Sequence, residues 1–199
     1  MSPSLVNGTE KKKGPVVCVF CGSAPGNSPA HVEQAQRLAQ LFHKHNITLI
    51  FGGGTTGVMG ALAAELVRLS GPNAVHGVIP EALVRFERDE TDQKPSETVD
   101  PSFGRTTRVP DMHTRKQMMV QEITTWNQLG IHDKPVVLFN VEGYWDGLLT
   151  WIKKATEAGF VREGNADILV EAHSAEDVVK RLRDYETAGG RLELDWEQK

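Results

Sequence analysis

The sequence has little of several features that would assign it to a particular class of protein. Cysteines number two and aromatic residues make up 7% of the 199 residues. No apolar run approaches the roughly 20 residues that a membrane-spanning helix needs. The net charge of −4, from 22 Lys and Arg against 26 Asp and Glu, argues against a broad nucleic-acid surface. We therefore expect a cytoplasmic protein that binds neither nucleic acid nor membranes, with residues 1–14 as a short disordered tail.

The two cysteines, Cys18 and Cys21, have the C-x-x-C spacing of some redox and metal sites. They lie in the apolar run Pro15–Cys21, which is typical of a strand, where residues three apart point to opposite faces. A redox pair would sit at a helix N-terminus, and the sequence has no second Cys or His pair to complete a zinc site. We expect two buried structural thiols, no metal and no cofactor.

Short apolar runs alternate with helical patterns along the chain. The runs are unbroken, which indicates strands covered on both faces. The alternation predicts an α/β fold, a Rossmann-like parallel sheet with helices on both faces, in a single domain over 15–188 with a C-terminal tail over 189–199. The polar segment Glu81–Arg108 reads as a mobile surface flap. The expected strands are Pro15–Cys21, Thr48–Phe51, Ala74–Ile79, Thr106–Val109 and Pro135–Phe139; the expected helices are Pro29–Asn46 with Ser28 as N-cap, Val58–Leu69, Tyr144–Ala158 and Ala175–Thr187.

The most informative stretch is the glycine-rich sequence Phe51–Gly60, between a predicted strand and a predicted helix. Its glycines permit tight turns, unpaired N–H groups at the helix start can face a ligand, and the helix dipole favours negative charge. Thr55 and Thr56 add hydroxyl donors. The spacing matches neither the dinucleotide fingerprint nor the P-loop, which would need a Lys after the last glycine. We predict a phosphate site here; the alternative is a strand–helix turn that binds nothing.

A second cluster follows the fourth predicted strand, in Pro110–Lys116. Asp111 can cap the helix that starts there. His113, Arg115 and Lys116 then crowd its first two turns, where the helix dipole disfavours cations. Cations placed against the dipole suggest an anionic ligand, and exposed solubilising charge is the alternative.

Together these motifs resemble the LONELY GUY family of cytokinin-activating phosphoribohydrolases, over about Val16 to Phe160. The matching blocks occur in order: Val19–Ser23, Gly52–Gly60, Gly77–Pro80, Asp111–Lys116, Thr125–Pro135 and Asn140–Tyr144. The resemblance implies hydrolysis of the N-glycosidic bond of a cytokinin riboside 5′-monophosphate, which releases the free base and ribose 5-phosphate. It also implies a homodimer. Such chemistry builds positive charge on the ribose, which a carboxylate near C1′ stabilises.

The resemblance also assigns roles to individual residues. The family's catalytic arginine falls on Arg115, its ligand-binding lysine on Lys116, a substrate-binding glutamate on Glu87 and a binding threonine on Thr125. The full set of expected substrate- and phosphate-binding residues is Ser23, Gly52, Gly53, Gly54, Thr55, Thr56, Gly57, Glu87, Arg115, Lys116 and Thr125.

One family segment is absent from this sequence. The family carries a second glycine loop, P-G-G-x-G-T-x-x-E, after a further buried strand, and this loop supplies the catalytic glutamate. Its absence predicts a sheet that lacks one central strand. Glu122 is a candidate replacement, about one helical turn or roughly 5 Å from the family position. The alternatives are a nucleosidase that acts on AMP, a catalytically dead nucleotide-binding protein, and an incomplete gene model.

Overall fold

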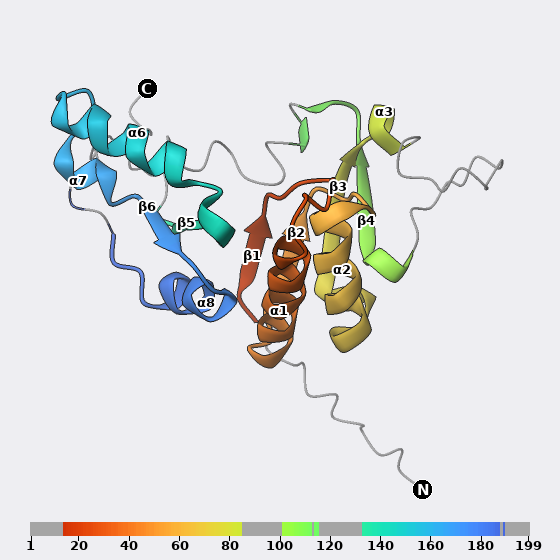
Figure 1. Cartoon of the computed structure of the whole chain (residues 1–199). Coiled ribbons are helices and arrows are strands. Elements are labelled where there is room, and N and C mark those ends of the chain that lie inside the picture. Colours follow the sequence, from red (N-terminus) through yellow and green to blue (C-terminus); the bar gives the residue numbers. More distant parts are fainter. Residues whose placement is uncertain (1–13, 85–100, 113, 116–132, 188, 190–199) are drawn as a thin grey trace, which may run out of the picture.

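The computed structural model describes residues 14–84, 101–112, 114–115, 133–187 and 189 (Figure 1). Its larger sheet contains four parallel strands in the order β1 (Val16–Val19), β2 (Thr48–Phe51), β3 (Val75–Pro80) and β4 (Arg105–Val109). Because each strand runs in the same direction, their carboxyl ends meet at one edge of the sheet. That edge is where ligands bind in open α/β sheets.

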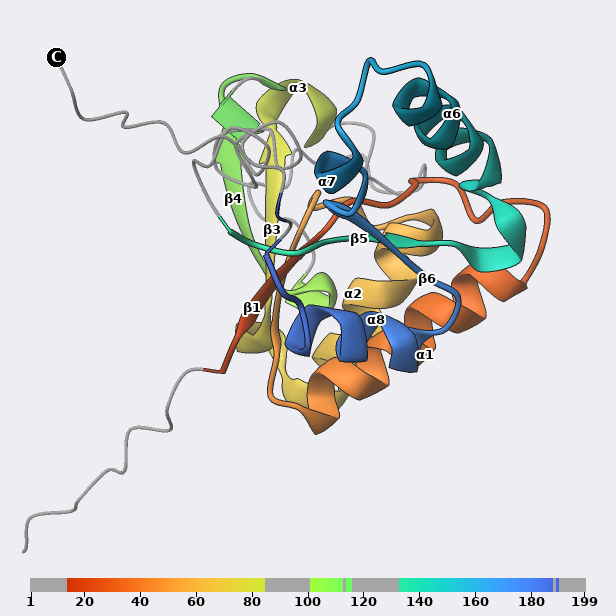
Figure 2. The same cartoon turned by 90° about the vertical axis from the view of Figure 1, so that its left-hand side faces the viewer.

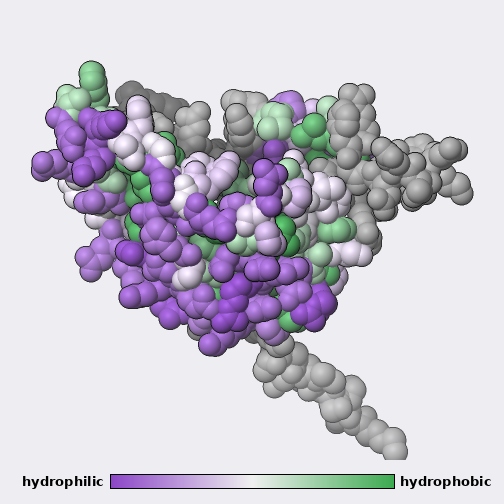
Figure 3. Space-filling model, viewed as in Figure 1, coloured by the Kyte–Doolittle hydropathy of each residue, from purple (hydrophilic) through white to green (hydrophobic). Residues whose placement is uncertain are grey.

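Two long helices cover one face of this sheet. Helix α1 (Ala30–Lys44) buries one stripe of its surface, which includes Leu38 and Phe42, and α2 (Gly57–Ser70) packs beside it. The opposite side of α1 is polar, so the surface over this part of the molecule is mainly hydrophilic (Figure 3). The Ser28 hydroxyl accepts a hydrogen bond from the Ala30 N–H at 3.2 Å, although Pro29 is the residue at the cap position.

A separate two-stranded parallel ladder contains β5 (Val136–Phe139) and β6 (Leu169–Ala172). Helix α8 (Ala175–Arg183) lies on one side of it, and α6 (Asp146–Glu157) and α7 (Glu163–Ala166) lie on the other (Figure 2). Helix α8 also contacts α1, so Val178 and Val179 belong to the same apolar core as the first sheet. Short helical turns complete the described chain: η1 (Pro72–Ala74), α3 (Glu81–Val84), η2 (Pro101–Phe103) and η3 (Val141–Gly143).

The described strands divide into two ladders; the prediction that one central strand is lacking stays a prediction, since residues 116–132 lie outside the described part of the chain. Within the described residues, β1 pairs only with β2 and β5 only with β6. The prediction that all strands are covered on both faces is wrong for β1, because Val16 is 58% exposed. Phe20, directly after β1, is also exposed. Val17, Val19 and Cys21 pack against the main core, so Val16 and Phe20 lie on the opposite face of the strand.

The expected flap is also partly wrong. Its two ends form α3, η2 and β4, and Phe103 of η2 packs against the main core. Only residues 85–100 of the segment lie outside the described residues. The described helices include none long and apolar enough to span a bilayer.

Candidate functional site at the carboxyl ends of the strands

The glycine turn after β2 lies directly on the end of β3. Gly52, Gly53 and Gly54 are all buried. Gly53 has a φ of +75°, and a Cβ atom there would lie 3.0 Å from Cβ of Ile79. Across the contact, a Cβ on Gly77 would lie 2.7 Å from Cα of Gly53. A side chain at Gly53 or Gly77 would push the turn and β3 apart, so only glycine allows this contact. Main-chain groups therefore line this edge of the sheet.

The loop between β1 and α1 is hydrogen-bonded onto the same turn. The Thr56 hydroxyl donates to the Ser23 carbonyl at 3.0 Å. The N–H groups of Val58 and Met59 donate to the carbonyls of Ala24 and Gly22 at 3.4 and 3.1 Å. This differs from the expectation of unpaired N–H groups throughout the helix start. An anion at this turn would be bound by N–H groups that precede Val58.

Arg115 connects the ends of β2 and β3. Its Nε donates to the Val78 carbonyl at 3.0 Å, and its Nη2 donates to the Gly52 carbonyl at 3.2 Å. A Cβ atom on Gly52 would lie 2.1 Å from that Nη2, so only glycine leaves room for the guanidinium. The structure therefore fixes a permanent positive charge against the predicted phosphate-binding turn.

The helix start that carries Arg115 is capped as the sequence predicts. The Asp111 carboxylate accepts a hydrogen bond from the Thr114 N–H at 2.8 Å, and the Asp111 carbonyl accepts one from the Arg115 N–H at 3.2 Å. The cap sets the direction in which the Arg115 side chain leaves its turn and reaches the sheet.

Both cysteines are free thiols, and each is partly buried, where the sequence predicted buried thiols. Cys21 packs against the main core and Cys18 against the cluster of Val78 and Val109 on the other face of the sheet, as their spacing predicts. Burial raises the pKa of Cys18 to about 12, although the nearby Arg115 charge partly offsets the effect. Burial also raises the pKa of Cys21 to about 11. Thiols with such values are protonated at neutral pH and are poor nucleophiles.

Only part of the predicted site lies in the described residues. Ser23, the turn from Gly52 to Gly57 and Arg115 come together at one edge of the sheet, as the hydrogen bonds above establish. Four predicted residues lie outside the described part of the chain: Glu87, Lys116, Glu122 and Thr125. His113 does as well. Within the described ranges there is no group of three or more His, Cys, Asp or Glu that could hold a metal ion.

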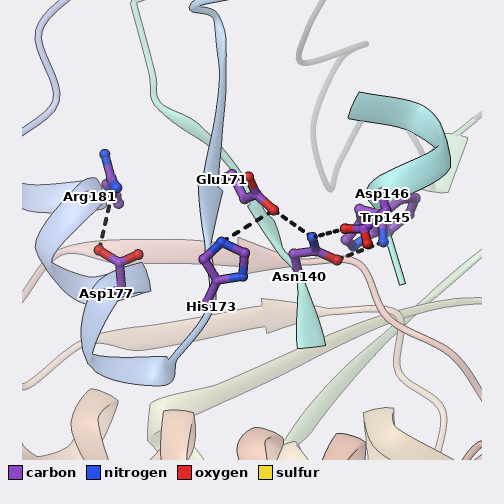
Figure 4. Close-up of polar contacts among 7 residues, drawn as sticks. All are labelled: Asn140, Trp145, Asp146, Glu171, His173, Asp177 and Arg181. Carbon is purple, nitrogen blue, oxygen red and sulfur yellow. Dashed lines mark hydrogen bonds and ion pairs between the residues drawn. The ribbon is translucent and has the colours of Figure 1, made fainter. Parts of the chain in front are cut away.

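A second polar cluster, centred on Asn140, was not predicted (Figure 4). The buried Asn140 amide donates to Asp146 at 2.7 Å and to Glu171 at 2.5 Å, and its oxygen accepts the Trp145 N–H at 2.7 Å. The Glu171 carboxylate also lies 3.4 Å from Nε2 of His173. An Asn placed directly after an apolar strand was the available signal, since a buried amide at such a position needs several partners.

Comparison with known proteins adds sequence relatives. A family model described as "possible lysine decarboxylase" matches residues 120–182. A bifunctional cytokinin biosynthesis protein of Fusarium pseudograminearum is 43% identical over 91% of this chain, which spans only 42% of that protein's length. Two cytokinin riboside 5′-monophosphate phosphoribohydrolases of Arabidopsis thaliana also match. LOG1 is 38% identical, over 85% of this chain and 83% of LOG1. LOG3 is 35% identical, over 94% of this chain and 92% of LOG3.

Among solved structures, the molybdenum cofactor carrier protein of Chlamydomonas reinhardtii superposes with a TM-score of 0.52 at 14% identity. The match covers 85% of this chain and 96% of the carrier protein. At this level of identity the likeness concerns the fold, and it confirms a Rossmann-like α/β architecture.

Proposed function

The chain belongs to the family of cytokinin riboside 5′-monophosphate phosphoribohydrolases, and from that premise we propose that it hydrolyses the N-glycosidic bond of such nucleotides. The products are the free cytokinin base and ribose 5-phosphate. The observation that carries the proposal is Arg115, whose guanidinium is held between the carbonyls of Val78 and Gly52 beside the glycine turn. A cation fixed at a turn of buried glycines suits a phosphorylated substrate.

In the proposed reaction the bonding electron pair leaves with the base nitrogen, and positive charge develops on the ribose. Water adds at C1′ and gives up a proton, while the departing base gains one. The glycine turn and Arg115 hold the 5′-phosphate, and a carboxylate near C1′ stabilises the developing charge. We assign this carboxylate to Glu122, with Glu87, Lys116 and Thr125 as further substrate contacts.

The proposal includes three properties of the whole protein. Residues 15–188 form the catalytic domain, the protein works as a homodimer, and it is located in the cytoplasm. Light scattering on the purified protein tests the dimer, and imaging of a tagged chain tests the location.

The decisive experiment measures base release from isopentenyladenosine 5′-monophosphate and from AMP. We expect turnover that Arg115→Ala reduces by at least about 100-fold, since the loss of one preorganised charged donor typically costs that much. The matched control is Arg37→Ala, which removes an exposed arginine that pairs with Glu176 at 2.6 Å on the surface between α1 and α8. Wild-type activity in that control is expected. Faster release from AMP would favour the AMP nucleosidase, and Glu122→Gln with an unchanged rate would eliminate Glu122 as the carboxylate.

A catalytically dead nucleotide-binding protein is the second candidate. The sequence favours it at one point, because the P-G-G-x-G-T-x-x-E segment is absent. Binding of AMP by a folded protein that shows no turnover with either nucleotide would establish this function and exclude the first.

A further inference from the structure

The first N–H groups of α2 are capped by another loop and not by the helix's own side chain. Thr56 is the N-cap residue, where a threonine hydroxyl ordinarily accepts a hydrogen bond from one of these N–H groups. The Thr56 hydroxyl accepts no such bond. The Val58 N–H donates instead to the Ala24 carbonyl at 3.4 Å. The Met59 N–H donates to the Gly22 carbonyl at 3.1 Å. Carbonyls of the loop between β1 and α1 therefore take the place of the cap.

The Thr56 hydroxyl bonds to the same loop. It donates to the carbonyl of Ser23, the residue between Gly22 and Ala24, at 3.0 Å. Gly57 permits this approach, because a Cβ atom there would lie 2.4 Å from the Ser23 carbonyl oxygen. The carbonyls of three consecutive loop residues are thus held by groups at the start of α2.

This bond limits what the Thr56 side chain can do for a ligand. A hydroxyl group has one proton to donate, and phosphate oxygens are bound by donors. The Thr56 proton already lies on the Ser23 carbonyl. Thr56 can therefore donate to a phosphate only by giving up its bond to the loop.

The position of the loop depends on such bonds. Residues 22–27 are all exposed, so burial of apolar surface contributes little to holding them in place. Ser23, in the same loop, is one of the predicted phosphate contacts. A change in the loop position would therefore change the predicted phosphate site.

We propose that Thr56 is a positioning residue of the phosphate site. Its hydroxyl fixes the loop between β1 and α1 against the start of α2, and other donors of the glycine turn contact the phosphate. The identity of the ligand rests on the proposed function. Loss of one hydrogen bond should shift the equilibrium between the attached and the released loop by about 2- to 10-fold. Thr56→Val removes this bond without removing a helix cap, because the hydroxyl accepts no bond from α2.

The test combines amide hydrogen exchange with the affinity for ribose 5-phosphate. Exchange at Val58 and Met59 reports release of the loop, because their N–H groups bond to its carbonyls. In ligand-free Thr56→Val we expect exchange at both amides to be about 2- to 10-fold faster and ribose 5-phosphate to bind about 2- to 10-fold more weakly. Thr56→Ser keeps the hydroxyl and should behave like wild type. So should the matched control Thr156→Val on α6, which removes a hydroxyl that donates to the Ile152 carbonyl at 3.0 Å.

A second comparison asks whether the bond to Ser23 persists when the ligand is bound. Saturating ribose 5-phosphate should slow exchange at Val58 and Met59 of the wild type, because the attached loop favours binding. Faster exchange on saturation would overturn the inference, since the phosphate would then have taken the Thr56 proton from the Ser23 carbonyl.

The remaining outcomes separate this inference from the proposed function. Unchanged exchange in Thr56→Val overturns the inference, whether or not binding weakens. Faster exchange with unchanged binding also overturns it, because the loop position would then not matter to the site. Faster exchange together with weaker binding, both restored in Thr56→Ser, supports it. A wild-type protein that binds no ribose 5-phosphate would instead refute the proposed phosphate site itself.

Discussion

Substitution of Gly57 tests how closely the β1–α1 loop approaches the glycine turn. Gly57 and Gly159 share positive φ angles of +61° and +77°. A Cβ atom on Gly159 would have nothing within 4 Å, whereas one on Gly57 would lie 2.4 Å from the carbonyl carbon and oxygen of Ser23. Alanine in the left-handed region costs about 1–2 kcal/mol at either site. Overpacking against backbone adds about 1–3 kcal/mol at Gly57 alone. We expect the free energy of unfolding to fall by about 1–2 kcal/mol in Gly159→Ala and about 2–5 kcal/mol in Gly57→Ala.

Urea unfolding, followed by circular dichroism and tryptophan fluorescence, measures both variants against wild type at constant m-value. Equal losses of stability would refute the close approach of Ser23 to the turn. The affinity for ribose 5-phosphate provides a second measurement. It should fall in Gly57→Ala, because the Ser23–Thr56 hydrogen bond is displaced, and remain unchanged in Gly159→Ala.

Further predictions concern the thiols and the Asn140 cluster. Iodoacetamide should modify Cys18 and Cys21 far more slowly in the native protein than in the urea-unfolded chain at pH 8. Burial raises the pKa of Cys18 to about 12 and that of Cys21 to about 11, so the native thiols stay protonated. The unfolded chain loses these protons first, so the free energy of unfolding should fall as the pH rises above about 9. The fall should reach up to about 1.4 kcal/mol per thiol and pH unit and should stop when the folded thiols ionise near pH 11–12. A Cys18→Ser/Cys21→Ser variant should lose this pH dependence. Asn140→Ala should lower the free energy of unfolding by about 2–4 kcal/mol, because two carboxylates lose a shared donor and the Trp145 N–H loses its acceptor. Asn140→Asp should cost more at pH 8 than at pH 5, since it adds a third carboxylate; equal costs at both pH values would contradict this reading of the cluster.

Strands β1, β2 and β3 were predictable because their apolar runs end at glycine or proline, whereas β4 contains Arg105 and Arg108 and was predicted only from Thr106. β2 was predicted to the residue, since Thr48–Phe51 is directly followed by glycines. β6 was missed because it contains Glu171, which looks like a surface residue in the sequence. Only the tertiary structure supplies its partner, the Asn140 amide, which lies 31 positions earlier in the chain.

The candidate site shows the same division between local and long-range information. Glycine density predicted a turn where backbones approach closely, and Gly77 against the backbone of Gly53 confirms that part. The sequence did not predict that carbonyls of Gly22 and Ala24 would pair with the first N–H groups of α2. That pairing depends on the path of a loop about thirty-five residues earlier in the chain, which no local pattern encodes.

The order of the first sheet has a consequence for how the chain assembles during synthesis. Spatial order follows chain order from β1 to β4, so each strand pairs with the strand made just before it. The sheet can therefore grow by addition at one edge while the polypeptide is still leaving the ribosome. Helix α8 is made much later, and its Val178 and Val179 complete the core against α1. Until then the apolar stripe of α1 is only partly covered, so a stalled nascent chain would expose a surface that chaperones recognise.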